Sequence, residues 1–230
     1  MSGPLLVTGG ASGIGARLVE SLAAERPVVV LDAAAPEAPV PDVRYVAGDV
    51  TDRDGLGALV AGLCVDGPLS GLVHCAGICR TGPFLDMPPG EWSRVLDVNL
   101  HGTLATVQAC APRMSDGGRI VLFSSGTAFK GPGGIAAYAA SKAGIIGFAR
   151  SMAAELGERR ITVNVLAPGL VVTGLSADFA HTEPANIAGR AIGRAATVDD
   201  FVEPVRFLLS GGASFVTGQT IVVDGGAIKH

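Results

Sequence analysis

The sequence is poor in aromatic and charged side chains, and it has no long apolar run. Aromatic residues make up 5% of the 230 residues and charged residues 17%, whereas hydrophobic residues make up 48%. No stretch approaches the roughly 18 uninterrupted apolar residues that a membrane span needs. The first residues also lack the charged and then apolar pattern of a signal peptide. We therefore expect a cytoplasmic protein with a sizeable core and no membrane partner.

Basic runs and paired cysteines are missing as well. The formal net charge is −4, which argues against a protein that binds nucleic acid by neutralising phosphates. The four cysteines are Cys64, Cys75, Cys79 and Cys110, and the middle two lack the two-residue spacing of a zinc or redox pair. We expect free thiols in a reducing compartment and no metal site.

Short β-branched runs alternate along the chain with longer helical patterns. The runs predict strands at 5–8, 28–31, 43–47, 69–75, 119–124, 162–166 and 220–223. The helical patterns cover 14–24, 53–63, 89–114, 138–156 and 198–209, and no helix is expected between 32 and 43. Strands that are apolar on both faces and alternate with helices predict an α/β fold. We expect residues 1–230 to form a single domain, a doubly wound parallel sheet (Rossmann fold) of about seven strands with helices on both faces.

A glycine-rich segment, Thr8-Gly9-Gly10-Ala11-Ser12-Gly13-Ile14-Gly15, follows the first predicted strand and opens the first helix. Glycines allow close approach of the backbone to a pyrophosphate, and the N–H groups of a helix N-terminus stabilise its charge. A purely structural turn is the alternative. The context of strand before and helix after favours a dinucleotide site that includes Gly9, Ser12, Gly13, Ile14 and Gly15.

Two aspartates follow the second and third strands. Asp32 can accept hydrogen bonds from both ribose hydroxyls of an adenosine, and its charge would repel a 2′-phosphate. Because Ser12 offers no compensating cation, we expect NAD rather than NADP, although Asp32 can also be a solvated loop residue. Asp49, followed by Val50, can bind the adenine amino group or cap the next helix.

Tyr138 and Lys142 share one face of a predicted helix because they are four residues apart. A free phenol has a pKa of about 10, and an ammonium about 4 Å away would lower it by about three units. That shift would bring the phenol into the range of acid–base catalysis. Taken alone, a tyrosine and a lysine on one helix are usually two surface residues. Ser125 ends the fifth predicted strand, so its hydroxyl can bind a substrate carbonyl together with the phenol.

With these motifs in order, the chain resembles the short-chain dehydrogenase/reductase family over its whole length. Three further segments add to the resemblance. They are Pro168-Gly169 followed by Val171 and Thr173, the stretch from Asp97 to Gly102 that contains Asn99, and the ending 216–226. It implies that Tyr138 exchanges a proton with the substrate, Ser125 orients the substrate oxygen, and Lys142 lowers the phenol pKa and holds the nicotinamide ribose. It further implies that Asn99 belongs to a proton relay and that the protein is a homotetramer, with a dimer as the alternative.

One segment departs from the family pattern. Where the family has Asn-Asn-Ala-Gly, this chain has His74-Cys75-Ala76-Gly77. The missing amides put local support of the sheet in doubt, but Cys75, Ala76 and Gly77 are small enough to let the cofactor pass. We expect His74 to be a packed strand histidine rather than a second base.

The segment from about 174 to 194 is expected to form a flap over the substrate. It is mostly apolar, with Leu175, Phe179, His181, Ile187 and Ile192, and Phe84, Phe129 and Ile135 are further candidates for the pocket wall. Arg80 and Lys130 are candidate anchors for an acidic substrate, although we expect both to face solvent.

The sequence thus predicts an NAD-dependent oxidoreductase that interconverts a secondary alcohol and a ketone or 3-oxoacyl thioester. A dihydrodiol dehydrogenase that yields a catechol is the alternative. A silent nucleotide-binding scaffold is disfavoured because Asn99, Ser125, Tyr138 and Lys142 are all present.

Overall fold

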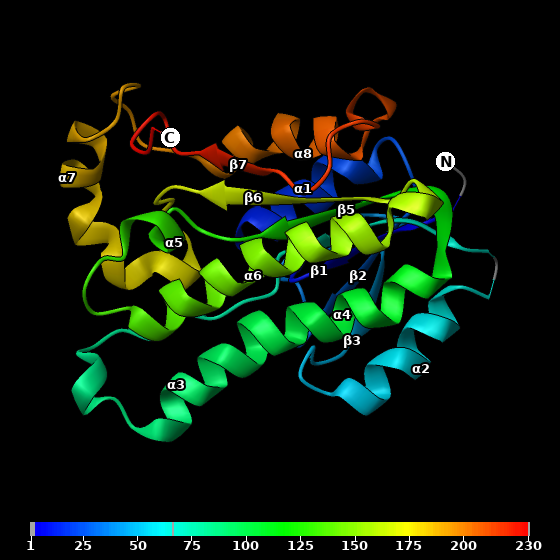
Figure 1. Ribbon diagram of the computed structural model, residues 1–230, viewed down its shortest axis with the longest axis horizontal. Helices are drawn as coiled ribbons and strands as arrows, with labels where there is room; N and C mark the ends of the chain where they lie inside the picture. Colours follow the sequence, from blue (N-terminus) through cyan, green and yellow to red (C-terminus); the bar gives the residue numbers. More distant parts are fainter. Residues whose placement is uncertain (1–2, 66, 230) are drawn as a thin grey trace.

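A computed structural model describes residues 3–65 and 67–229, which build one parallel sheet (Figure 1). The strand order is β3-β2-β1-β4-β5-β6-β7, and each neighbouring pair is parallel. The strands are β1 (Leu5–Thr8), β2 (Val28–Asp32), β3 (Arg44–Ala47), β4 (Leu69–His74), β5 (Met114–Phe123), β6 (Thr162–Pro168) and β7 (Thr220–Val223). The chain order reverses between β1 and β4, which is where a doubly wound sheet binds its ligand. The predicted fold class is confirmed.

Helices cover both faces of the sheet (Figure 1). One face carries α1 (Gly13–Ala23) and α8 (Val202–Leu209), and the other carries α2 (Arg53–Leu63), α4 (Gly102–Cys110) and α6 (Ala136–Glu155). The shorter helices α3 (Pro89–Leu96), α5 (Thr127–Lys130) and α7 (Glu183–Ala188) lie toward one end of the molecule. No helix among the described residues is long and apolar enough to cross a membrane.

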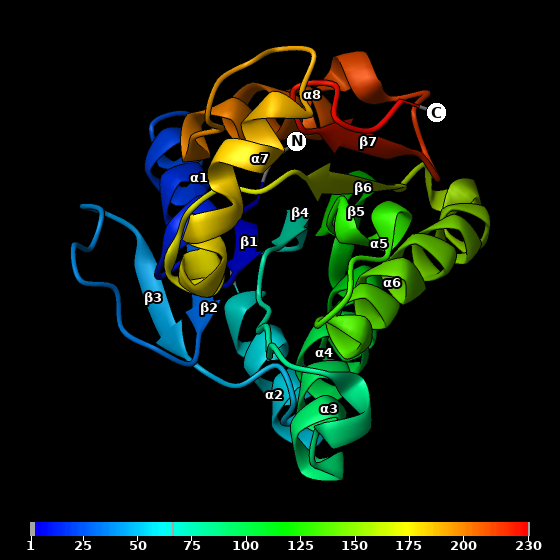
Figure 2. The ribbon, with the colours of Figure 1, turned by 90° about the vertical axis from the view of Figure 1, so that its left-hand side faces the viewer.

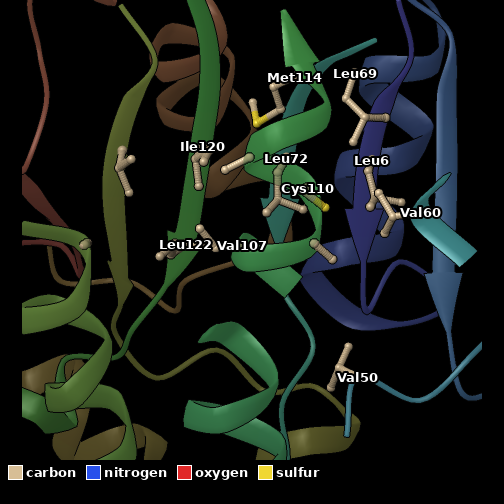
Figure 3. Packing of buried hydrophobic residues seen from close by; sticks show 14 of the residues in the cluster. Leu6, Val50, Val60, Leu69, Leu72, Val107, Cys110, Met114, Ile120 and Leu122 are labelled. Atoms are coloured by element: carbon tan, nitrogen blue, oxygen red, sulfur yellow. The ribbon is translucent and has the colours of Figure 1, made fainter. Parts of the chain in front are cut away.

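The central strands bury side chains on both faces, so the sheet separates two apolar cores. On β1, Leu6 joins the core under α2, α4 and α6, whereas Leu5 and Val7 join the core under α1 and α8. Figure 3 shows the first of these cores, in which Leu72 of β4 lies between Leu6 of β1 and Ile120 of β5. Each fully buried leucine or isoleucine contributes about 1.5–3 kcal/mol relative to an exposed one. This explains why these strands are continuous apolar runs in the sequence.

The predicted helix over 89–114 is confirmed as one continuous helical stretch from Pro89 to Arg113, although it is not α-helical throughout. The structure has α3, a π-helical turn at Asp97–His101, α4, and a 3₁₀ turn at Ala111–Arg113, and β5 starts at Met114 rather than 119. Pro112 cannot donate a backbone hydrogen bond. Arg159 donates to the carbonyls of Ala111 (2.7 Å) and Met114 (2.5 Å) and pairs with Asp116 at 3.1 Å. These contacts fix the point at which the helical stretch ends and β5 begins.

The loop between Asp32 and Arg44 contains no helix among its described residues, as predicted. The flap does contain helical structure, a 3₁₀ segment at Gly174–Thr182 followed by α7, and the sequence had not predicted it. Thr173 begins this segment with a reciprocal cap, because its backbone N–H donates to Ser176 Oγ at 3.0 Å. The flap therefore starts from a fixed point next to β6.

Candidate active site

A cavity of about 730 Å³ lies at the carboxyl ends of the strands. Figure 2 looks toward this end of the molecule, with α7 and α5 on either side of the end of β4. All predicted site residues except Asn99 line this cavity, namely Gly9, Ser12, Gly13, Ile14, Gly15, Asp32, Asp49, Val50, Cys75, Ala76, Gly77, Ser125, Tyr138, Lys142, Pro168, Gly169, Val171 and Thr173. The fold thus brings together residues from both halves of the chain.

The glycine-rich turn is too tightly packed for larger residues at two positions. A methyl group on Gly9 would lie 2.5 Å from the backbone nitrogen of Ala76, and Gly9 has a φ of +69°. A methyl group on Gly15 would lie 2.0 Å from the carbonyl oxygen of Gly9. Gly9 therefore packs against the loop after β4, and the first turn of α1 packs against Gly9.

The N-terminus of α1 is suited to an anion. Ser12 stands at the cap position in an extended conformation, its side chain makes no capping bond among the described residues, and the first turn has no acidic residue. The first N–H groups of a helix lack intrahelical acceptors and carry partial positive charge. The cavity wall at this point therefore fits a pyrophosphate.

Asp32 is bonded to the glycine-rich turn itself. Its Oδ2 accepts from the backbone N–H of Ala11 at 2.9 Å, and its Oδ1 accepts from that of Ala34 at 3.0 Å. A carboxylate oxygen can accept two hydrogen bonds, so each oxygen retains capacity for a ribose hydroxyl. The arrangement fits the expected adenosine site, and it also fixes the carboxylate there.

Asp49 does not cap α2, so that alternative is wrong. The cap is Asp52, whose Oδ1 accepts from the backbone N–H of Gly55 at 3.0 Å. Asp49 Oδ1 accepts instead from the backbone and the hydroxyl of Thr51, both at 2.8 Å. Its Oδ2 pairs with Arg94 at 3.2 Å, and these bonds lower the pKa of Asp49. Arg94 also lines the cavity, and no sequence motif had indicated it.

His74 supports the sheet at the place where support was in doubt. Its Nδ1 lies 2.8 Å from Thr8 Oγ1, which ties β4 to β1, and the side chain is 1% exposed. Burial lowers the pKa of His74 to about 3, so the ring is neutral. The prediction of a packed strand histidine is confirmed. Burial also raises the pKa of Cys75 to about 12, which leaves a small neutral thiol beside the cavity.

Lys142 is buried, 4% exposed, and its Nζ donates to the carbonyl of Phe123 at 2.8 Å. Burial lowers the pKa of Lys142 to about 8. The Nζ lies 5.7 Å from the centroid of the Tyr138 ring. Burial, aided by Cys79, raises the pKa of Tyr138 to about 12, and a hydrogen bond with Ser125 opposes the rise. In the protein alone, burial thus dominates the pKa of the phenol. The lowering of this pKa by Lys142 stays a prediction.

A chain of hydrogen bonds fixes the start of α6. Ser124 Oγ donates to the carbonyl of Lys142 at 2.7 Å. Ser141 Oγ donates to the carbonyl of Tyr138 at 2.7 Å and accepts from Asn99 Nδ2 at 3.1 Å. The helix that carries the phenol is thereby fastened both to the end of β5 and to the π turn.

Asn99 is fully buried behind the cavity wall. Its Oδ1 accepts from the backbone N–H of Ile78 at 2.8 Å, and its Nδ2 donates to the carbonyl of Ile78 at 2.9 Å. A methyl group on Gly77 would lie 3.2 Å from Asn99 Oδ1 and 3.4 Å from Lys142 Nζ. Asn99 thus holds the loop after β4 beside Lys142, and a part in a proton relay stays a prediction.

The substrate end of the cavity is only partly as predicted. Leu175, Phe179 and His181 of the flap and Ile135 line the cavity, whereas the described side chains of Ile187, Ile192, Phe84 and Phe129 lie outside its wall. Phe84 instead contacts Trp92, with ring centroids 6.4 Å apart. Arg80 pairs with Glu91 at 3.1 Å, but Lys130 does line the cavity.

Several residues that line the cavity were not predicted from the sequence. Arg190 is 8% exposed and donates to the carbonyls of Leu170 at 2.7 Å and Arg194 at 2.6 Å, so it ties the flap to the loop after β6. Asp224, Ala227 and Ile228 close the other side. The sequence Asp224-Gly225-Gly226 was noted as a family feature, but nothing in it indicated that the next residues reach the cavity.

These residues give the cavity two distinct ends. One end offers helix N–H groups and a carboxylate to a dinucleotide, and the other offers a phenol, a hydroxyl and a buried ammonium beside an apolar wall. No group of three or more metal-ligating side chains occurs among the residues that the structure describes.

Comparison with known proteins agrees with this arrangement. The model of the family described as "Enoyl-(Acyl carrier protein) reductase" matches residues 9–227. The chain is 38% identical to the short-chain reductase protein NovJ of Streptomyces niveus, over 96% of this chain and 92% of that protein. It is 33% identical to the 3-oxoacyl-[acyl-carrier-protein] reductase FabG of Escherichia coli, over 96% and 95% of the two chains.

Solved structures are similarly close. A short-chain type dehydrogenase/reductase from Mycobacterium ulcerans matches with a TM-score of 0.89 at 32% identity, over 99% of this chain and 90% of that one. A short-chain dehydrogenase from Leptospira borgpetersenii, solved with bound NAD⁺, matches with a TM-score of 0.87 at 30% identity, over 99% and 93%. The chain therefore belongs to the short-chain dehydrogenase/reductase family and is an oxidoreductase of that family.

Proposed function

We propose that the protein is an NAD(H)-dependent oxidoreductase that interconverts a secondary alcohol and a ketone or 3-oxoacyl thioester. The observation that carries the proposal is that one cavity joins the N-terminus of α1 and Asp32 to Ser125, Tyr138 and Lys142. A dinucleotide that reaches from one end to the other would place its nicotinamide beside the phenol. Homologues named as a 3-oxoacyl reductase and an acetoacetyl-CoA reductase support a carbonyl substrate.

The residues of this chain would hold the cofactor along its length. The N–H groups at the start of α1 bind the pyrophosphate, and Asp32 accepts from the ribose hydroxyls of the adenosine. Lys142 binds the other ribose, and Pro168 and Gly169 face the nicotinamide. When bound, the nicotinamide supplies or accepts the hydride.

Tyr138 and Ser125 act on the substrate oxygen. In the direction of reduction, the Ser125 hydroxyl and the phenol donate hydrogen bonds to the carbonyl oxygen, and the phenol transfers its proton there. A pKa of about 12 keeps the phenol protonated at neutral pH, as a proton donor must be. With a pKa of about 8, Lys142 is mostly cationic at pH 7, and its charge favours the phenolate that remains.

Asp32 is the residue on which the preference for NAD depends. A 2′-phosphate about 4 Å from its carboxylate would cost roughly 4 kcal/mol at an effective dielectric of 20. None of the cationic side chains that line the described cavity hydrogen-bonds to Asp32.

We further propose that residues 1–230 form a single domain with a flap at about 174–194. We also propose that the protein is cytoplasmic and forms a homotetramer, with a dimer as the alternative.

The test uses the only two tyrosines of the chain. Tyr138→Phe removes the proton donor, so the rate of NADH-dependent ketone reduction should fall by about 10²–10⁴-fold. The affinity for NADH, measured by nicotinamide fluorescence, should stay within about threefold. Tyr45→Phe is the matched control, because the Tyr45 hydroxyl accepts from the backbone N–H of Val40 at 3.2 Å and Tyr45 does not line the described cavity. Full activity in Tyr138→Phe would rule out the proposed role.

A further inference from the structure

The chain turns sharply after β7 and comes back toward the active site. Asp224 Oδ1 accepts from the backbone N–H groups of Gly226 at 2.9 Å and Ala227 at 3.1 Å. Gly225 and Gly226 have φ values of +70° and +78°, which glycine adopts without strain. The side chain of Asp224 is 5% exposed, so the acceptor that shapes this turn is itself fixed by packing.

The end of the flap holds the turn in place. The backbone N–H of Ile192 donates to the carbonyl of Gly225 at 2.8 Å. A methyl group on Gly226 would lie 3.0 Å from Ala191 Cβ, and one on Gly225 would lie 3.3 Å from Arg190 Cδ. Because Arg190 also bonds to the carbonyl of Leu170, the turn is fastened to the loop after β6 through the same segment.

This turn delivers Ile228 to the catalytic end of the cavity. A methyl group on Gly126 would lie 3.1 Å from Ile228 Cδ1 and 3.3 Å from the carbonyl oxygen of Pro168. Gly126 directly follows Ser125, and its N–H donates to that same carbonyl at 2.8 Å. The Ile228 side chain therefore packs where the backbone that carries the catalytic hydroxyl meets the Pro168-Gly169 segment.

We infer that Ile228 is a specificity-determining residue that limits the size of the substituent on the carbonyl carbon of the substrate. This inference rests on the proposed function, which holds the carbonyl oxygen at Ser125 and Tyr138. A substituent on the same carbon then extends along the wall that Ile228 forms beside Gly126. The preferred substrates are carbonyl compounds with a small apolar group at this position.

The experiment compares two 3-oxoesters that differ at one position, ethyl acetoacetate with a methyl group and ethyl benzoylacetate with a phenyl group. For each variant, kcat/KM for NADH-dependent reduction gives the ratio of phenyl to methyl substrate. Ile228→Ala should raise this ratio at least tenfold, and Ile228→Phe should lower it. A general loss of folded protein cannot raise the phenyl-to-methyl ratio in one Ile228 variant and lower it in the other.

Ile192→Ala is the matched control, because this isoleucine belongs to the segment that holds the turn but lies outside the cavity wall. It should leave the ratio within twofold of the wild type. An unchanged ratio in both Ile228 variants would overturn the inference while leaving the proposed function intact. If the wild type reduces neither ester, the proposed function fails for these substrates. Binding of each ester can then be measured instead, as the rise in Tm that the ester causes in the protein saturated with NADH. If the phenyl ester raises the Tm of wild type and of Ile228→Ala by the same amount, the inference is overturned.

Discussion

His74 is a buried side chain that stands where the family pattern has an asparagine, and it links two strands by a hydrogen bond. It also makes the stability of the protein depend on pH. The ring bonds to Thr8 across two central strands, and its Nε2 has no partner among the described residues. A proton on this ring would place a charge in the core with Lys142 nearby, and burial together with that charge lowers its pKa to about 3. The folded protein therefore favours the neutral ring.

Acid should destabilise the protein through this residue. The unfolded chain takes up a proton at His74 near pH 6.5, whereas the folded chain does so only near pH 3, so stability is lost as the pH falls below about 6.5. Between pH 7.5 and 5.5 the loss should be about 1.4 kcal/mol, as measured by urea unfolding. In His74→Asn that part of the loss should vanish, whereas His181→Asn, on the exposed flap, should behave as the wild type. Equal pH dependence in all three proteins would show that His74 titrates normally.

At the residue scale, the sequence predicted which side chains gather but not their electrostatics. Motif spacing placed Tyr138, Lys142 and Ser125 correctly at one cavity. The rise of the phenol pKa in the protein alone was not predicted because it depends on burial, which no local pattern encodes. Ile228 was missed for a related reason, since its approach to Gly126 depends on a turn formed about a hundred residues later in the chain.

At the element scale, the glycine-rich turn connects β1 to α1, and residues of the turn line the cavity proposed to bind the cofactor. Gly15 lies in the first turn of α1, and its Cα faces the carbonyl oxygen of Gly9 at a distance that leaves no room for a side chain. The close approach determines where the N–H groups of α1 point. Helix packing and anion binding therefore depend on the same glycine.

Substitutions at two helical glycines should have opposite effects. Gly15→Ala places a methyl group 2.0 Å from a backbone oxygen, so it should cost about 1–3 kcal/mol and weaken NADH binding at least tenfold. Gly57→Ala is the control, because a methyl group at this position in α2 meets nothing within 4 Å. It should raise the free energy of unfolding by up to about 1 kcal/mol without changing NADH binding. Chemical unfolding and fluorescence titration measure the two effects, and unchanged NADH binding in Gly15→Ala would contradict this account of the turn.

The sequence predicted the strands and the long helices well, and it missed local features that depend on contacts with distant residues. The apolar runs of β1, β2, β4 and β6 placed those strands within two residues of their observed ends. The helical pattern over 89–114 is confirmed to within one residue by the continuous helical stretch from Pro89 to Arg113. The π turn at Asp97–His101 and the early start of β5 at Met114, whose carbonyl accepts from Arg159, were not predicted.

At the scale of the whole molecule, the fold concentrates chemistry at one edge of the sheet. The two cores on either side of the sheet account for the apolar composition, and the polar residues that the sequence singled out lie mostly at the carboxyl ends of the strands. The reversal of strand order between β1 and β4 leaves room there for a ligand that reaches both halves. The segment from 174 to 194 and the turn after β7 both contribute residues to the cavity wall.

The central claim is that this cavity binds NAD(H) with Asp32 as the selecting residue. The most direct test is a titration of the purified protein with NADH and with NADPH, followed by nicotinamide fluorescence. The account predicts that NADH binds at least tenfold more tightly, a difference of about 1.4 kcal/mol, and that Asp32→Ser narrows the difference. Equal or tighter binding of NADPH by the wild type would contradict the role of Asp32, and binding of neither nucleotide would contradict the proposed function of the cavity.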